Sequence, residues 1–393
     1  VLALALDLGG LAVFKDAGFL VENFHAICGT ALPVPQIPLP IGISFYTVQA
    51  LSYTVDVWRG DVQAQRSFGK FLLYISLFPQ LIAGPIVRYA DVEKQIDDRT
   101  FSPTDAFYGA TRFCVGLAKK VLLADAAGKV ATQILDGAAA STTTAAAWLG
   151  ILLYTFEIYF DFSGYSDMAI GMGRIFGFKY MENFRLPYTS RSITEFWRRW
   201  HISLGSFFRD YVYIPLGGKK KHQILNMAIV WALTGLWHGA SWNFALWGLY
   251  FFVILTIEKL LGSRQKKIPS VLRHVITMLF VIFGWNIFYY TDLTRMVQSF
   301  GTLFGECGSG LFDAQTGILL TNNLPLLLVC AIGVTSVPQN IGNLFGGMCA
   351  QKQTTAGQVV YAAVTYAFDL ALLALSTIAL VGSTYNAFLY FRF

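Results

Sequence analysis

Long stretches of this chain carry no ionised side chain, and this feature restricts the possible folds more than any other. Four such stretches lie at residues 137–156, 223–257, 275–291 and 314–351. A helix needs about 20 mainly apolar residues to cross a bilayer, and these stretches approach or exceed that length. Backbone amides in lipid must be paired within the protein, which leaves only helices or a closed barrel. The uninterrupted runs lack the alternation of barrel strands. The sequence therefore predicts an all-α, polytopic transmembrane bundle.

Composition excludes an ordinary soluble domain, because charged residues make up only 13% of the chain and the mean hydropathy is +0.53. Soluble domains carry about 25% charged residues. We expect roughly eight to ten membrane-embedded segments in one domain spanning residues 1–393, surrounded by membrane lipid and without a nucleic-acid partner. The chain opens on Val1 rather than Met, so we expect that an amino-terminal segment is missing. Five scattered cysteines indicate neither a disulfide framework nor a metal site.

Basic residues are concentrated in short clusters at 119–120, 198–199, 219–221 and 264–267. Such clusters are typical of cytoplasmic loops, and this is the first interpretation. The alternative is that some of them also meet a phosphorylated substrate. The sequence leaves both open.

Two apolar stretches contain their own helix breakers. Residues 71–87 include Pro79 and Pro85, each of which removes a helix hydrogen bond, so we expect a re-entrant or kinked segment there. Residues 223–257 as one helix would be about 52 Å long, against a hydrocarbon core of about 30 Å. The glycines Gly235 and Gly239 flank His238 in this stretch. We therefore expect two segments that meet near His238.

A third segment predicts an interfacial amphipathic helix. Ser192 and Glu195 have the spacing of a capping box, and the helix should then run to about Tyr213 and stop near Pro215. Four residues would share one face by helical spacing: Trp197, His201, Leu204 and Phe208. An aromatic face opposite cationic residues is typical of a helix at the membrane interface.

Two histidines are the candidates for chemistry. An ionisable group within a membrane segment is costly and is treated as functional by default, so His238, with polar neighbours and glycines around it, is a candidate catalytic group. The alternative for His238, and more strongly for His201, is a neutral side chain that only packs between helices. Asp161 and Asp167 are six residues apart, on nearly opposite faces of a helix, so we expect them to make structural hydrogen bonds rather than act as a pair.

Several longer motifs resemble the membrane-bound O-acyltransferase family. They are EFWRRWHISL at 195–204, FRDYVYIPLG at 208–217 and LTGLWHGASWN at 233–243, together with GISFYT at 42–47, FPQLIAGPIVR at 78–88, FDFSGYSDMAIG at 160–171 and FLYFRF at 388–393. The resemblance covers nearly the whole chain. It is closest to the bacterial branch that serves alginate O-acetylation, which is related to the branch that serves teichoic-acid D-alanylation.

This resemblance implies a ring of helices around a funnel or tunnel in the bacterial inner membrane. The essential histidine of the family matches His238, and its second histidine matches His201. No bound cofactor is implied; the acyl donor arrives from the cytosol and is acetyl-coenzyme A in alginate-type members or a carrier-protein thioester in the other branch. The carboxyl-terminal motif implies Tyr390 as a transient acyl acceptor, from which a periplasmic acetyltransferase partner passes the group to a polysaccharide such as alginate.

A chemical role can be assigned to each candidate on this basis. Acyl transfer to a hydroxyl needs a base, and a histidine with a pKa near 6.5 is the usual choice, so His238 is the expected general base toward Tyr390. His201 would orient substrate or share the proton. The oxyanion needs fixed donors; the candidates for donors or substrate contacts are Trp237, Trp242, Asn243, Trp197 and Arg198, or the backbone amides of 235–239. The basic residues Arg198, Arg199 and Lys219–Lys221 would meet coenzyme phosphates or only anchor the protein.

Three other functions remain open at this point. One is a transporter of acyl groups, since broken helices and buried polar groups also occur in transporters, although no internal symmetry supports it. Another is a non-catalytic scaffold in which His238 only packs. The third is an acyltransferase of the same family that serves peptidoglycan, cellulose or D-alanylation.

Overall fold

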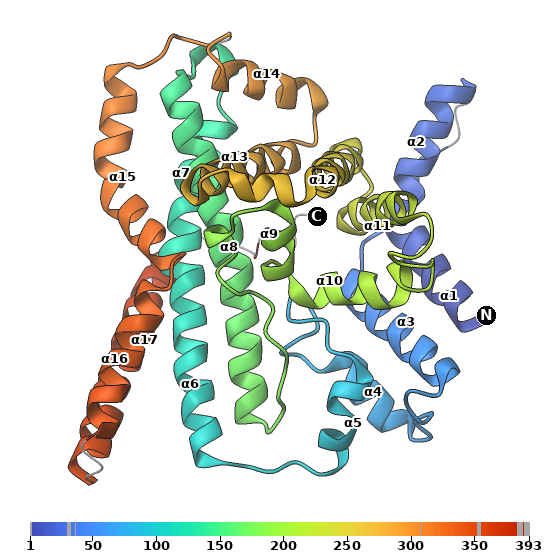
Figure 1. Cartoon of the computed structure of the whole chain (residues 1–393), viewed down its shortest axis with the longest axis vertical. Coiled ribbons are helices and arrows are strands. Elements are labelled where there is room, and N and C mark those ends of the chain that lie inside the picture. The colour runs from blue at the N-terminus through green and yellow to red at the C-terminus, as the bar shows by residue number, and fades with distance from the viewer. Residues whose placement is uncertain are drawn as a thin grey trace.

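The computed structural model describes residues 2–29, 33–35, 37–306, 308–351, 355–382 and 388. Over these residues the regular structure is helical and contains no strand, which confirms the predicted all-α class. Figure 1 shows the helices arranged around a long central helix, α8 (Thr144–Ile175). Thr143 caps this helix by accepting a hydrogen bond from the backbone N–H of Ala146 at 3.1 Å.

Helix α8 packs closely on α6 (Pro103–Ala118) because glycines of the two helices face each other. A Cβ atom on Gly109 would lie 2.5 Å from the carbonyl oxygen of Gly171, and one on Gly116 would lie 2.6 Å from that of Gly164. Small residues allow this approach of two backbones within a membrane. After α6 the chain continues through a π-helical turn, η2 (Lys119–Ala124), into α7 (Asp125–Leu135), which also packs on α8.

Five helices among the described residues are long and apolar enough to cross a membrane. They are α8, α12 (Trp242–Leu261), α13 (Ser270–Tyr289), α15 (Ala314–Gly333) and α17 (Thr355–Val381). In its most apolar window α8 is 72% buried inside the protein, whereas α15 and α17 are only 11% buried. Figure 1 shows α15, α16 (Val337–Gln351) and α17 along one edge of the molecule. Their exposed apolar faces therefore suit contact with lipid, and the chain is a multi-pass membrane protein. The expected eight to ten embedded segments stay a prediction.

The amino-terminal helices lie on the opposite side of the bundle (Figure 1). Helices α1 (Leu2–Leu11) and α2 (Ala17–Cys28) form one continuous rod through the π-helical turn η1 (Ala12–Asp16). Helix α1 packs on α3 (Ile43–Arg59). The amino-terminal helix α1 therefore packs against the helical bundle through α3.

The predicted breaks in the two apolar stretches are confirmed. Helix α11 (Gln223–His238) ends at the histidine itself, Gly239 is extended, and α12 begins at Trp242. In the other stretch α4 (Phe68–Ser76) ends before Pro79, and after turns and extended backbone the chain enters α5 (Tyr89–Asp97). Glycine and proline therefore mark these positions correctly.

The single helix expected from Ser192 to Tyr213 is wrong. The chain forms α9 (Ile193–Arg199), breaks at Trp200 and His201, and resumes as α10 (Ile202–Phe208) and the π-helical turn η5 (Arg209–Tyr213). His201 has φ +44°, in the left-handed region. The break is stabilised by backbone hydrogen bonds to a distant segment, from the N–H of Ile202 to the oxygen of Asn183 and from the N–H of Arg185 to the oxygen of Arg199, both at 2.9 Å.

The break also changes two details of the sequence prediction. Trp197 lies before the break and His201 lies within it, so the expected continuous face from Trp197 to Phe208 does not form. The amino-terminal cap is confirmed, since the Ser192 hydroxyl accepts from the N–H of Glu195 at 3.0 Å. The Glu195 carboxylate, however, accepts from the N–H of Arg191 rather than from that of Ser192.

Candidate active site

His238 lies at the junction of α11 and α12, surrounded by aromatic rings from three helices. Its imidazole centroid is 4.9 Å from that of Trp247 on α12 and 5.2 Å from that of Phe288 on α13. Together with Asp161 of α8 these residues line a cavity of about 40 Å³. We call this the inner cavity. It has room for one or two water molecules, and the expected tunnel stays a prediction.

His201 is buried, with 3% of its surface exposed, and belongs to a polar network. Its Nδ1 lies 3.1 Å from the side-chain oxygen of Asn183, which also accepts from the N–H and the hydroxyl of Ser203 at 3.2 and 2.8 Å. The amide nitrogen of Asn183 donates to Ser166. Because three groups converge on the amide oxygen, Nδ1 of His201 carries the proton and Nε2 keeps its lone pair.

The free nitrogen of His201 is aimed into an apolar environment. Nε2 is buried and has no hydrogen-bond partner among the described residues. Phe162 packs on the ring with centroids 4.7 Å apart. Burial lowers the pKa of His201 to about 3, since desolvation disfavours the charged form. The neutral imidazole is therefore an acceptor, suited to a hydroxyl or amide of a substrate.

Trp237 connects the two histidines. Its ring centroid lies 4.9 Å from that of His238 and 5.8 Å from that of His201. The indole N–H of Trp237 donates to the backbone oxygen of Ser44 at 3.1 Å. The structure therefore brings both predicted histidines to one aromatic cluster.

The other predicted contact residues are placed as follows. The indole N–H of Trp242 donates to Asn23, and the amide of Asn243 donates to the backbone oxygen of Phe288. Because Trp237 donates to Ser44, the side-chain donors of Trp237, Trp242 and Asn243 all have partners. Their oxyanion role stays a prediction, and it requires these hydrogen bonds to be exchanged. The buried indole N–H of Trp197 has no partner in the described part of the chain, whereas Arg198 is exposed.

A buried ion pair that the sequence did not reveal borders the inner cavity. Asp161 lies 2.7 Å from Lys120, which also pairs with Asp125 at 2.7 Å. Lys119, its neighbour in η2, pairs with Asp167, and so does Arg112. Residues 119–120 therefore lie in a helical turn and not in the expected loop, with both lysines turned toward α8, and their cytoplasmic placement stays a prediction. A π-helical turn is often found at functional sites, but hydropathy alone gives no sign of it.

Phe388, the first residue of the carboxyl-terminal motif, lies at the same cavity. Phe388 lines it, with its ring centroid 4.8 Å from the Lys120 ammonium and 4.9 Å from the ring of Tyr165. Tyr390, the predicted acyl acceptor, lies outside the described residues. In the sequence Tyr390 follows Phe388 by two residues.

Lys15 is a second group that sequence reasoning missed. Its ammonium donates to the hydroxyl of Ser44 at 2.9 Å and to the backbone oxygen of Trp237, the residue before His238. A cation at the carboxyl end of a helix is stabilised by the helix dipole, and here it holds the end of α11. The available signal was a lone lysine within the apolar run that opens the chain.

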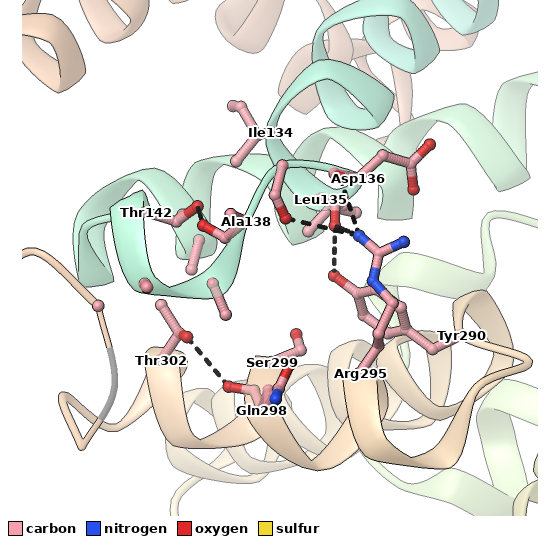
Figure 2. Close-up of a pocket in the computed structure, with 15 residues that line it drawn as sticks. Ile134, Leu135, Asp136, Ala138, Thr142, Tyr290, Arg295, Gln298, Ser299 and Thr302 are labelled. Atoms are coloured by element: carbon pink, nitrogen blue, oxygen red, sulfur yellow. Dashed lines mark hydrogen bonds between the residues drawn. The ribbon is translucent and has the colours of Figure 1, made fainter.

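Another pocket, of about 680 Å³, lies away from the histidines. Figure 2 shows it between the end of α7 and α14 (Leu293–Leu303), where Arg295 donates to the carbonyl oxygens of Leu135 and Asp136. Tyr290 donates to the same Leu135 oxygen. None of the predicted site residues lines this pocket, so the aromatic chamber around His238 is the candidate active site.

Comparison with known proteins identifies the family of this chain. The model of the membrane-bound O-acyltransferase family matches residues 47–300, a range that contains both His201 and His238. The chain belongs to the membrane-bound O-acyltransferase family. It is therefore an O-acyltransferase and a multi-pass membrane protein, as the motifs predict.

The similar family members act on bacterial glycans. The chain is 38% identical to the "Probable alginate O-acetylase AlgI" of Azotobacter vinelandii, over 100% of this chain and 84% of that protein. It is 33% identical to the peptidoglycan O-acetyltransferase of Helicobacter pylori, over 79% of this chain and 65% of that protein. It is 32% identical to the teichoic acid D-alanyltransferase of Bacillus subtilis, over 63% and 68% respectively.

Proposed function

We propose that this acyltransferase takes an acetyl group from cytosolic acetyl-coenzyme A and delivers it across the bacterial inner membrane for O-acetylation of an extracytoplasmic polysaccharide such as alginate. Similarity to alginate O-acetylases over the whole chain supports the acetyl group and the polysaccharide. The observation that carries the mechanism is that His238 and Phe388 line one cavity, with Tyr390 two residues farther along the chain.

The proposed chemistry has two transfers. The hydroxyl oxygen of Tyr390 attacks the thioester carbonyl carbon while His238 takes the hydroxyl proton. The carbon–sulfur bond then breaks, and the coenzyme thiolate leaves with that proton. The resulting acetyl ester of Tyr390 is attacked by a glycan hydroxyl on a periplasmic acetyltransferase partner, which regenerates the tyrosine hydroxyl. His201 has the role of holding the acceptor hydroxyl, or an amide N–H of the coenzyme arm, through its free Nε2.

Substitution of the two reacting groups tests this mechanism. We expect His238→Ala to lower acetyl transfer by about 10²–10⁴-fold, the usual contribution of a general base, with normal membrane insertion. The matched control is His222→Asn, because His222 is exposed and its left-handed backbone suits asparagine. Retained transfer in the His238 variant removes this residue from the mechanism. For Tyr390→Phe, unchanged acetylation of the polysaccharide eliminates the tyrosine relay.

The same variants separate the alternative functions. A transporter or a scaffold would keep its activity without a base at position 238, provided that folding is intact. The similarity to the Helicobacter peptidoglycan O-acetyltransferase makes peptidoglycan the second candidate acceptor. Mass spectrometry of each glycan from a deletion strain distinguishes them, since only the true acceptor loses its acetyl groups.

A further inference from the structure

A second chamber adjoins the inner cavity on the side of α13 and α15. It has a volume of about 460 Å³, within the range of small-molecule sites, and we call it the outer chamber. Half of the residues that line it are apolar, such as Phe156, Met278 and Val334, and the other half are polar, including Thr189, Ser270 and Thr335. None of the residues assigned a role above lines it.

The two chambers are one helical turn apart along two different helices. On α8, Thr155 lines the outer chamber and Ile158 lines the inner cavity; on α13, Ile282 and Trp285 do the same. Three residues correspond to about 4.5 Å along a helix. The outer chamber is therefore a neighbour of the site around His238, and only one layer of side chains separates them.

This layer is an aromatic partition held by hydrogen bonds. The indole N–H of Trp285 donates to the hydroxyl of Tyr188 at 3.1 Å, and that hydroxyl donates to the backbone oxygen of Thr155 at 2.6 Å. The ring of Trp200 packs against both, at centroid distances of 4.8 Å from Trp285 and 6.0 Å from Tyr188. Tyr188 faces the outer chamber, while Trp200 and Trp285 face the inner cavity. Rotation of these rings would join the two spaces.

The outer chamber is electrostatically suited to an anion. Its wall contains Arg191 and His274 and no carboxylate. Nδ1 of His274 lies 2.9 Å from the backbone oxygen of Ser190 and donates to it, so the imidazolium form of His274 would donate to an anion through Nε2–H. Ser270 begins α13, whose amino-terminal dipole favours negative charge. The basic loop at 264–267 precedes that helix directly.

From this geometry we infer that the outer chamber is the donor vestibule: it binds the phosphorylated thioester, with the phosphates at Arg191 and His274 and the uncharged arm along the apolar wall toward the Tyr188–Trp285 partition. This inference rests on the proposed function, because the thioester is its donor. The basic residues of the chamber match the phosphates of a coenzyme A thioester, and its apolar wall matches the uncharged arm. The shared partition places the acyl end of the thioester next to His238.

Two thioesters that share the pantetheine arm, of which only one carries the phosphorylated adenosine nucleotide, test the charge assignment. Full-length protein in phosphatidylcholine nanodiscs is assayed with acetyl-coenzyme A and with S-acetylpantetheine, which has no phosphate. We expect Arg191→Gln and His274→Gln each to raise KM for acetyl-coenzyme A roughly tenfold, as for loss of a hydrogen bond to a charged group, with kcat within about twofold. KM for S-acetylpantetheine should stay unchanged. An equal rise for both thioesters indicates a structural role and overturns the assignment.

Cysteine modification tests the location without relying on turnover. In a variant whose five native cysteines are replaced by alanine, Val271→Cys places a thiol on the chamber wall. Val275→Cys is the matched control, because Val275 is also an exposed valine of α13 but does not line the chamber; Gln298→Cys places a thiol in the pocket of Figure 2. Labelling is verified by mass.

We expect acetyl-coenzyme A to protect only the thiol of the Val271→Cys variant from a maleimide, and this variant to lose acetyl transfer once it is modified. Protection by phosphatidylglycerol but not by acetyl-coenzyme A would make the chamber a lipid site instead. Full activity after modification of the thiol at position 271 also overturns the inference while leaving the proposed function intact. If acetyl-coenzyme A protects that thiol but the enzyme transfers no acetyl group even before maleimide treatment, the result contradicts the proposed function instead.

Discussion

Gly235 of α11 controls how closely the helix that carries His238 approaches α12, and Gly235→Ala is the most informative perturbation. A Cβ atom at this position would lie 2.5 Å from the backbone oxygen of Phe244. Across the same interface, a Cβ on Gly248 would lie 2.5 Å from the backbone oxygen of Trp231. Neither obstacle is a flexible side chain, so the two backbones themselves must separate.

The size of the effect follows from these distances. Ordinary contact begins near 3.4 Å, so relief of the clash requires a separation of roughly 0.9 Å, and overpacking of this kind costs about 1–3 kcal/mol of stability. His238 is three residues farther along α11 and moves with it. A misplacement of about 1 Å in a reacting group can lower a rate about 10²-fold. We therefore expect Gly235→Ala to lose about 100-fold in acetyl transfer, beyond any loss of folded protein.

The assay compares kcat/KM per folded molecule with the thermal midpoint in detergent. Gly205→Ala in α10 is the control, since its Cβ would have only one neighbour, at 3.8 Å, and alanine favours the helix. This control should keep its rate within about twofold. If Gly235→Ala retains a rate within threefold of the unmodified protein, or loses activity only in proportion to its unfolded fraction, the geometric reasoning is refuted.

Three further predictions concern the surroundings of the site. Arg112→Met removes one of the two cations that pair with Asp167, which keeps Lys119, and the cation that pairs with the partly exposed Glu182, so unfolding should become easier by about 1.5–3 kcal/mol, as for loss of a hydrogen bond to a charged group, measured as a lower thermal midpoint; an unchanged midpoint contradicts this. Phe388→Ala removes one cation–π and one ring contact, each worth about 0.5–1.5 kcal/mol, so acetyl transfer should fall roughly tenfold and a carboxypeptidase should remove the terminus faster. Burial raises the pKa of Asp210, but hydrogen bonds from Arg209 and Arg88 outweigh burial and hold that pKa below its usual value. The ionised Asp210 carboxylate therefore stabilises the fold above about pH 4, and this stabilisation is lost as pH falls through the lowered pKa. In the Asp210→Asn variant the thermal midpoint should decline less steeply below about pH 4.

Much of the architecture could be read from local sequence. The uncharged stretches predict helices in lipid, Gly235 and Gly239 predict the break beside His238, and Ser192 predicts the start of α9; all three are confirmed. These signals work because hydropathy, capping and glycine content act through neighbours within about one helical turn. His238 could be selected for the same reason, as the lone histidine in a long apolar stretch.

The tertiary structure alone decided how the site is assembled. Nothing local predicts that α9 stops at Trp200, because the hydrogen bonds that replace the helical ones come from Asn183 and Arg185. The turn of Lys120 toward Asp161 likewise depends on the packing of η2 against α8. The sequence by itself determined the helical membrane class and the histidine at a helix break. Long-range contacts, whose partners are far apart along the chain, decided which side chains surround that histidine and where an adjoining chamber lies.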